Sequence, residues 1–249
     1  MKFSWHAQVG RPVIVAHRGS SAIAPENTLS AFSQAILDRA DAAELDVRAT
    51  KDGEIVAIHD SHLSRTTDGH GRVENCLFSD LKKLDAGGWF GRKFASERVP
   101  ALTEVLELIG GRIGINIEVK SRPGAFAGAG FIEKLVGILR EYRNRESVLV
   151  SSFNTEIIKS IKKIEPGIVT GLIYGQGAGF TREYTGADFL ICSKRFLRRK
   201  TVAKEHKLGH RIGVYVVNDS RTFLRLSKWG VDSVYSDNPA YLKEITVCT

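Results

Sequence analysis

Residues 13–47 read VIVAHRGSSAIAPENTLSAFSQAILDRADAAELDV. The stretch opens with three β-branched residues, continues through a helical pattern over residues 29–40, and ends with a second strand-like run over residues 43–47. Strand, helix and strand in this order predict a βαβ unit, in which the two strands lie parallel in one sheet.

The rest of the chain repeats this alternation. Further strand-like runs occupy residues 113–119, 148–151, 168–173, 189–192, 212–217 and 231–235, and helical patterns occupy residues 131–142, 155–164, 196–208 and 221–229. Eight strands in 249 residues match the usual size of a (β/α)8 TIM barrel. A doubly wound sheet would use fewer strands and carry a glycine-rich phosphate turn after the first. The barrel is therefore the predicted fold.

One segment interrupts the rhythm after the second strand. An alternating run at residues 54–59 precedes about forty residues that contain Gly69, Gly71, Gly87, Gly88 and Gly91, and the next helix starts near Thr103. Loops that follow barrel strands lie on the face that carries active sites, so we expect the insertion at about residues 60–100 to cap the substrate site; a surface decoration is the alternative. No repeat or linker divides the chain, and residues 1–249 are expected to form one domain.

The composition limits location and partners. No apolar run is long enough to span a membrane, and the first residues lack the apolar stretch of a signal peptide, so a cytoplasmic protein without stable membrane insertion is expected. Cys76, Cys192 and Cys248 are too far apart for a short metal motif and are expected to be free thiols. The net charge of +8 suits an anionic partner, but no nucleic-acid motif accompanies it.

Residues with catalytic chemistry stand where two predicted strands end. The first strand runs directly into His17 and Arg18, at the end where a barrel places its reactive groups. In the second strand Glu44 and Asp46 are two residues apart, so their side chains share a face at a spacing of about 7 Å. Two carboxylates directed into a barrel mouth would repel each other unless a cation lay between them, and Mg2+ or Ca2+ takes such oxygen ligands.

The third strand and the run after the second add matching groups. Glu118 and Lys120 again lie two apart on one face, which adds a third carboxylate and a cation for phosphate oxygens. His59 ends the run at residues 54–59 and supplies a second imidazole. Two histidines beside a metal-held phosphodiester are what general acid-base cleavage requires. Each residue alone has a structural explanation, but their combination at successive strand ends indicates an active site.

These motifs continue along nearly the whole chain and resemble those of the glycerophosphodiester phosphodiesterase family. The resemblance is carried by His17-Arg18-Gly19, Pro25-Glu26-Asn27-Thr28, Glu44-Leu45-Asp46-Val47, Ile58-His59-Asp60, Arg65-Thr66-Thr67-Asp68-Gly69, Arg98-Val99-Pro100, Glu118-Val119-Lys120, Ser151-Ser152-Phe153 and Gly230-Val231-Asp232.

The resemblance implies a TIM barrel that hydrolyses diesters such as glycerophosphocholine or glycerophosphoethanolamine to sn-glycerol 3-phosphate and an alcohol. It implies one divalent cation, Mg2+ or Ca2+ with Mn2+ as an alternative, on Glu44, Asp46 and Glu118. His17 and His59 would be the acid and base, in an order that the sequence leaves open, and Arg18 and Lys120 would bind the phosphate. Phe153 and Tyr215 are expected to contact the substrate.

The chain departs from the family pattern outside this set. Tyr215-Val216-Val217-Asn218 stands where the family often has Trp-Thr-Val-Asn, and Asp232-Ser233 replaces an Asp-Gly pair, which affects the pocket for the alcohol. Three other functions are weighed against the hydrolysis of soluble diesters: a lysophospholipase D-like activity on lipid phosphodiesters, an inactive barrel that binds phosphorylated ligands, and a nucleic-acid-binding module.

Overall fold

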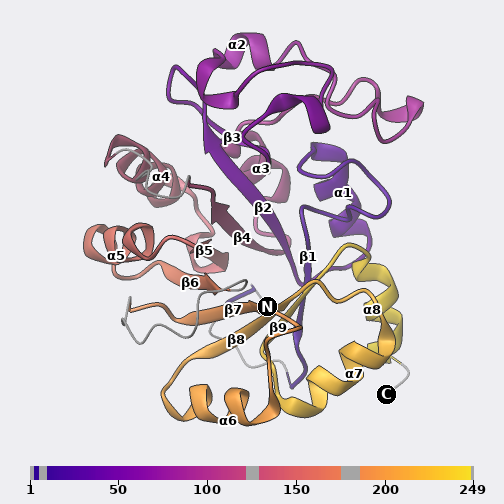
Figure 1. Cartoon of the computed structure of the whole chain (residues 1–249), viewed down its shortest axis with the longest axis vertical. Helices are drawn as coiled ribbons and strands as arrows, with labels where there is room; N and C mark the ends of the chain where they lie inside the picture. Colours follow the sequence, from indigo (N-terminus) through magenta and orange to yellow (C-terminus); the bar gives the residue numbers. More distant parts are fainter. Residues whose placement is uncertain (1–2, 6–9, 122–128, 175–185, 248–249) are drawn as a thin grey trace.

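Eight parallel strands form a closed barrel in the computed structural model, which describes residues 3–5, 10–121, 129–174 and 186–247. The strand order runs from β1 through β9, β8, β7, β6, β5 and β4 to β2, and β1 also pairs with β2, which closes the ring. The predicted TIM barrel is therefore confirmed (Figure 1). The barrel strands are β1 (Val13–Ala16), β2 (Ala42–Ala49), β4 (Gly114–Val119), β5 (Val148–Ser152), β6 (Val169–Tyr174), β7 (Phe189–Ser193), β8 (Arg211–Tyr215) and β9 (Ser233–Ser236).

Helices surround the strands in Figure 1. They are α1 (Leu29–Leu37), the short α2 (Phe78–Leu81), α3 (Leu102–Ile109), α4 (Ala129–Glu141), α5 (Thr155–Ile164), α6 (Arg199–Lys207), α7 (Ser220–Trp229) and α8 (Pro239–Val247). The sequence reading did not include α8, which starts with a proline in its first helical position and has a weak apolar pattern. No helix in the described ranges combines the length and apolar character needed to cross a bilayer.

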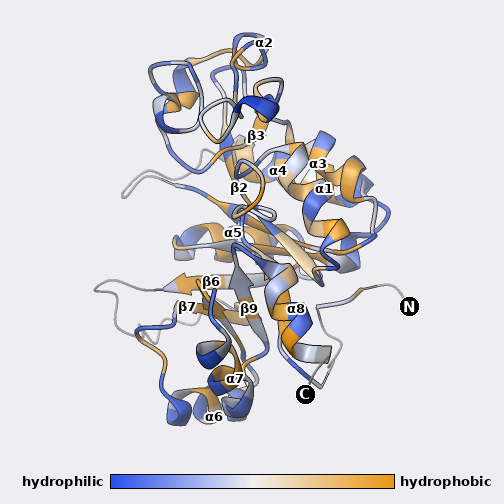
Figure 2. Ribbon diagram, turned by 90° about the vertical axis from the view of Figure 1, so that its right-hand side faces the viewer, coloured by the Kyte–Doolittle hydropathy of each residue, from blue (hydrophilic) through white to orange (hydrophobic). Residues whose placement is uncertain are grey.

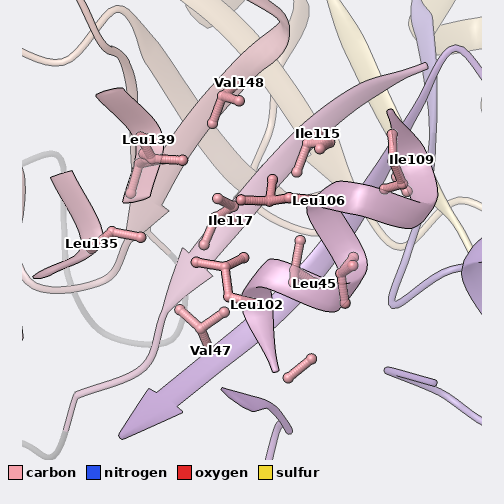
Figure 3. Close-up of a cluster of buried hydrophobic side chains, with 14 of the residues drawn as sticks. Leu45, Val47, Leu102, Leu106, Ile109, Ile115, Ile117, Leu135, Leu139 and Val148 are labelled. Atoms are coloured by element: carbon pink, nitrogen blue, oxygen red, sulfur yellow. The ribbon is translucent and has the colours of Figure 1, made fainter. Parts of the chain in front are cut away.

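Side chains alternate between the two faces of each barrel strand. In β2, Leu45 and Val47 point outward into a buried cluster, and Ile115 and Ile117 of β4 join them. Figure 3 shows this cluster, in which Leu102, Leu106 and Ile109 of α3 cover the two strands. Because the odd-numbered residues of β2 face the helices, Glu44 and Asp46 must face the barrel interior.

The barrel interior changes from apolar to polar along its axis. Near the amino ends of the strands Trp5 is buried, and its indole N–H donates to the carbonyls of Ser147 (2.8 Å) and Ile115 (3.2 Å). Above that layer Asn116 donates to the Tyr235 hydroxyl at 3.0 Å and accepts a hydrogen bond from Ser151. The carboxyl ends of the strands therefore lie above a closed and hydrogen-bonded core.

Several element boundaries differ from the predicted ones. Helix α1 ends at Leu37 instead of residue 40, because Arg39 has a left-handed φ of 56° that a helix cannot contain. Strand β8 stops at Tyr215, two residues before the end of the predicted run, and helix α6 begins three residues later than expected, at Arg199.

The insertion after β2 has a small core of its own. Strand β3 (Ile55–Ala57) pairs antiparallel with β2, and the following turns bury Ile58, Leu63, Val73 and Leu81 together. In Figures 1 and 2 this segment lies beside the barrel, next to β2 and β3. Cys76 and Cys192 are free thiols as predicted, and Cys248 lies outside the described residues.

Asp41 joins the start of the barrel to the last helix. Its carboxylate accepts two hydrogen bonds from Arg11 (2.7 and 2.9 Å), one from the backbone N–H of Ile14 (2.8 Å) and one from Lys243 of α8. Burial raises the pKa of Asp41, but these partners outweigh it and hold the pKa below its ordinary value of 3.8. The charged form of Asp41 therefore stabilises the fold.

Replacing Asp41 with Asn should lower the free energy of unfolding at neutral pH by about 1.5–3 kcal/mol, the usual range for hydrogen bonds to a charged group. Because the folded-state pKa is depressed, the loss should be complete above the unfolded-state pKa and should shrink as the pH falls through the folded-state value. Urea unfolding of both proteins over a pH series measures the difference. A difference that does not change with pH would contradict this role for the charge.

Candidate active site

Three carboxylates meet inside the barrel mouth. Glu44 and Asp46 lie on β2 and Glu118 on β4, and the strand register sets Asp46 beside Glu118. One oxygen from each of the three side chains lies within 4.8 Å of the others, and Glu44 and Asp46 are 2% and 1% exposed. Such a group of oxygen ligands suits a hard divalent cation.

Unpaired oxygens in this cluster test whether a cation fits. Glu44 Oε1 is buried without a hydrogen-bond partner, and Asp46 Oδ1 receives no well-aligned hydrogen bond although Lys120 Nζ lies 2.9 Å from it. Burial and the neighbouring Asp46 raise the pKa of Glu44 to about 8. Without a cation the cluster holds its full negative charge only at high pH, so its chemistry matches that of a divalent metal site.

Two cations approach the same carboxylates. The backbone N–H of Arg18 donates to Glu44 Oε2 at 2.8 Å, and the Arg18 guanidinium lies 3.2 Å from Asp46 Oδ2. Lys120 forms ion pairs with Asp46 and Glu118. Burial lowers the pKa of both cations, but the carboxylates around them outweigh it, so that each stays charged. Both are placed to meet an anion that reaches the cluster.

Each of the two predicted histidines has a carboxylate beside its Nδ1 atom. His17 Nδ1 lies 2.7 Å from Asp237 Oδ1, and His59 Nδ1 lies 2.5 Å from Asp60 Oδ1. Among the described residues neither Nε2 atom takes a hydrogen bond, and both imidazoles remain partly exposed. A carboxylate on Nδ1 fixes the ring orientation and tautomer, which leaves Nε2 available for proton transfer.

The surrounding groups shift the pKa values of His17 and His59 in opposite directions. Burial lowers the pKa of His17, but the hydrogen bond to Asp237 and the nearby Glu44 outweigh it, and the pKa is raised. Burial also lowers the pKa of His59, and with Lys120 and Arg18 it prevails over the opposing influence of Asp46. The mouth therefore holds two titratable groups of unequal proton affinity.

Sequence reasoning missed the role of Asn27. Its side chain donates to Asp46 Oδ2 at 2.8 Å and accepts from the backbone N–H of Asp46 at 3.1 Å. Asn27 is 4% exposed, and both Asn27 and Arg18 have a left-handed φ of 58°. Such strained residues persist where the surrounding contacts fix them, as is common at functional sites. Asn27 belongs to the motif Pro25-Glu26-Asn27-Thr28, but no feature of the neighbouring sequence indicated that its side chain bonds to Asp46 of β2.

Sequence reasoning also missed a network that starts from Arg65 in the insertion. Arg65 donates to both Glu26 oxygens (2.8 and 2.7 Å) and, through Nε, to Asp60 Oδ2 at 2.5 Å. Glu26 in turn accepts from Arg18 at 2.8 Å, and Asp60 bonds to His59. One guanidinium therefore connects the carboxylate beside His59 to the carboxylate beside Arg18.

The two aromatic residues predicted to contact the substrate differ in burial and in their distance from the carboxylate cluster. Tyr215, at the end of β8, is half-buried, and burial together with the nearby Glu118 raises its pKa to about 12. Phe153 follows β5 and is 52% exposed. The structure therefore brings Tyr215 to the carboxylate cluster, whereas Phe153 stands on the outer rim of the same barrel end.

Comparison with known proteins shows the family of this chain. The sequence model of the Glycerophosphoryl diester phosphodiesterase family matches residues 17–241. The chain belongs to this family. A glycerophosphodiester phosphodiesterase from Caldanaerobacter subterraneus is 39% identical over 93% of this chain and 96% of its own length. A glycerophosphodiester phosphodiesterase from Bacillus subtilis is 31% identical over 92% of this chain and 84% of its own length.

A solved structure shows the same fold with a product bound. The phosphodiesterase from Oleispira antarctica in complex with the product sn-glycerol-3-phosphate superposes with a TM-score of 0.88 at 32% identity, over 94% of this chain and 96% of that one. Membership in the glycerophosphoryl diester phosphodiesterase family makes this chain a phosphoric diester hydrolase.

The carboxylate cluster yields a prediction about stability. In EDTA at about pH 9, above the raised pKa of Glu44, Glu44→Gln should be more stable than the wild type by roughly 1–3 kcal/mol, because it removes one of three like charges from a largely buried site. Added Mg2+ or Ca2+ should raise the melting temperature of the wild type and have little effect on the variant. Thermal unfolding with and without metal measures both effects, with Glu74→Gln in the insertion as a control. An equal metal response of wild type and Glu44→Gln would contradict the site.

Proposed function

We propose that this chain hydrolyses water-soluble glycerophosphodiesters, such as glycerophosphocholine and glycerophosphoethanolamine, to sn-glycerol 3-phosphate and an alcohol. The observation that carries the proposal is the mouth of the barrel, where three carboxylates within 4.8 Å, two of them buried, lie close to two imidazoles that each have a carboxylate on Nδ1. The glycerol 3-phosphate in the Oleispira antarctica relative supports the product.

Glu44, Asp46 and Glu118 would hold one divalent cation, Mg2+ or Ca2+, with Mn2+ also suited to oxygen ligands. When bound, this ion would offset most of the negative charge of the three carboxylates and would polarise the phosphoryl oxygens of the substrate. Arg18 and Lys120, both charged and adjacent to the cluster, bind the remaining phosphate oxygens.

The histidines move the protons. With Nδ1 of each ring fixed by Asp237 or Asp60, the free Nε2 atoms face the substrate. One imidazole takes the proton from the glycerol hydroxyl next to the phosphate, which attacks phosphorus and forms a cyclic phosphate, while the other gives a proton to the oxygen of the leaving alcohol. Water then opens the cyclic phosphate to sn-glycerol 3-phosphate, with the two imidazoles in reversed roles. Tyr215 and Phe153 lie at the ends of β8 and β5, where they contact the alcohol portion.

The first experiment is an assay of glycerol 3-phosphate release from glycerophosphocholine. The purified chain should release it with Mg2+ or Ca2+, and EDTA should abolish the release. Activity that survives complete metal removal would refute the metal-dependent reaction. No release from any soluble glycerophosphodiester would refute the proposed substrate class.

The histidine roles give a second prediction. His17→Ala and His59→Ala should each lower kcat on the order of 100-fold or more, because each removes a group that transfers a proton in the transition state. His70→Ala is the control, since His70 is an exposed histidine in the insertion. Circular dichroism shows whether the variants remain folded. A folded His59→Ala protein with wild-type kcat would refute the role of that residue.

The Arg65 network gives a third prediction. Arg65→Ala should lower kcat about 10- to 100-fold, because displacing His59 and Arg18 by as little as 1 Å has costs of this size. Arg65→Lys should restore only part of the loss, since an ammonium cannot bridge Glu26 and Asp60 with the same geometry. Arg72→Ala, which breaks an ion pair with Glu74 elsewhere in the insertion, is the matched control. Full activity of Arg65→Ala would show that the network does not position the site.

A further inference from the structure

Three of the exposed aromatic side chains follow the carboxyl ends of barrel strands. Four large aromatics are exposed among the described residues: Trp89 (44%), Phe153 (52%), Phe196 (49%) and Tyr241 (40%). Phe153 and Phe196 lie between a barrel strand and the next helix, and Tyr241 lies in the first turn of α8, whereas Trp89 belongs to the insertion. In a parallel barrel the segments of Phe153, Phe196 and Tyr241 emerge at the carboxyl ends of the strands, which is the face that holds the carboxylate cluster.

A basic segment lies on the same rim. The stretch from Lys194 to Lys207 contains seven Lys or Arg residues and a single Glu, within a chain whose whole net charge is +8. Arg195, Arg198 and Arg199 are exposed, and none of them forms an ion pair with a described residue. The only acid in the stretch, Glu205, is buried against His210 and so does not offset this surface charge.

This segment adjoins the catalytic mouth. It begins directly after β7, and the backbone N–H of Lys194 donates to the carbonyl of Tyr215 at 3.0 Å. Tyr215 lies within electrostatic reach of Glu118 and Lys120. The exposed Phe196 is therefore presented at the rim of the mouth, with Arg195 next to it and Arg198 two residues further on. Figure 1 shows α6 continuing from this rim along the outside of β7 and β8.

We propose that the face of the barrel that carries the active site docks on an anionic phospholipid bilayer. The headgroup region of such a bilayer accepts aromatic rings at its apolar boundary and attracts Lys and Arg through its negative surface potential. A merely solvated basic helix would need no exposed aromatics beside it. Nucleic acid would be matched by the charge alone, whereas the lipid surface matches the charge and the aromatic rim together. This docking is independent of the proposed substrate.

Sedimentation with vesicles tests the docking. The full chain should bind vesicles of phosphatidylcholine mixed with about one third phosphatidylglycerol and should bind pure phosphatidylcholine vesicles far more weakly. High salt should release it, because exposed charges are screened beyond about one Debye length. Equal binding to neutral and anionic vesicles, or no binding to either, would overturn the proposal.

Substitutions in the segment from Lys194 to Lys207 test whether vesicle binding occurs at this rim. Each basic residue near an anionic surface contributes about fivefold in affinity, so reversing both Arg195→Glu and Arg198→Glu should weaken vesicle binding by at least about 25-fold. Phe196→Ser should weaken it severalfold. Lys207→Glu and Leu208→Ser, at the far end of α6, are the matched controls and should retain binding within about twofold. An equal loss in the controls would overturn the assignment to the rim.

Two further readouts separate the alternatives. Release of glycerol 3-phosphate from soluble glycerophosphocholine should be unchanged in Phe196→Ser, because this residue lies outside the proposed catalytic groups. Vesicle binding without hydrolysis would refute the proposed function and support the docking; hydrolysis without vesicle binding would do the reverse. If a DNA duplex bound more tightly than the anionic vesicles and lost binding in the same Arg variants, the partner would be nucleic acid and the proposal would be wrong.

Discussion

The central constraint on this structure is the repulsion among three carboxylates inside the barrel. Glu44, Asp46 and Glu118 are close enough to share one ion, and burial removes the water that would otherwise separate their charges. The surrounding residues offset this cost in part: Lys120 and Arg18 bring positive charge, and Asn27 fixes Asp46 on two sides. Because Glu44 Oε1 remains unpaired, the compensation is incomplete, as expected where a cation belongs to the site.

Most of the fold and the centre of the site could be predicted because both follow from local periodicity. Alternation along β2 and β4 places the carboxylates and Lys120 on the inner face. The regular recurrence of strand and helix in a chain of this length predicts the barrel. The weak apolar pattern of α8 and the left-handed φ of Arg39 that ends α1 early gave no comparable signal.

The partners of the site residues could not be predicted, because they come from distant parts of the chain. His17 and Asp237 are 220 residues apart and meet only when β9 pairs with β1. Arg65 reaches Glu26 across 39 residues, once the insertion packs beside the barrel. A sequence shows which residue types are present, but a contact of this kind depends on the closed ring and the docked insertion.

The two imidazoles consequently depend on different parts of the fold. Closure of the barrel orients His17 through Asp237, whereas the insertion orients His59 through Asp60 and Arg65. Strand β2 is the element common to both, since it pairs with β1, with β4 and with β3 of the insertion. Glu44 and Asp46 are on this same strand. Any change in the register of β2 would therefore displace the carboxylates from both histidines at once.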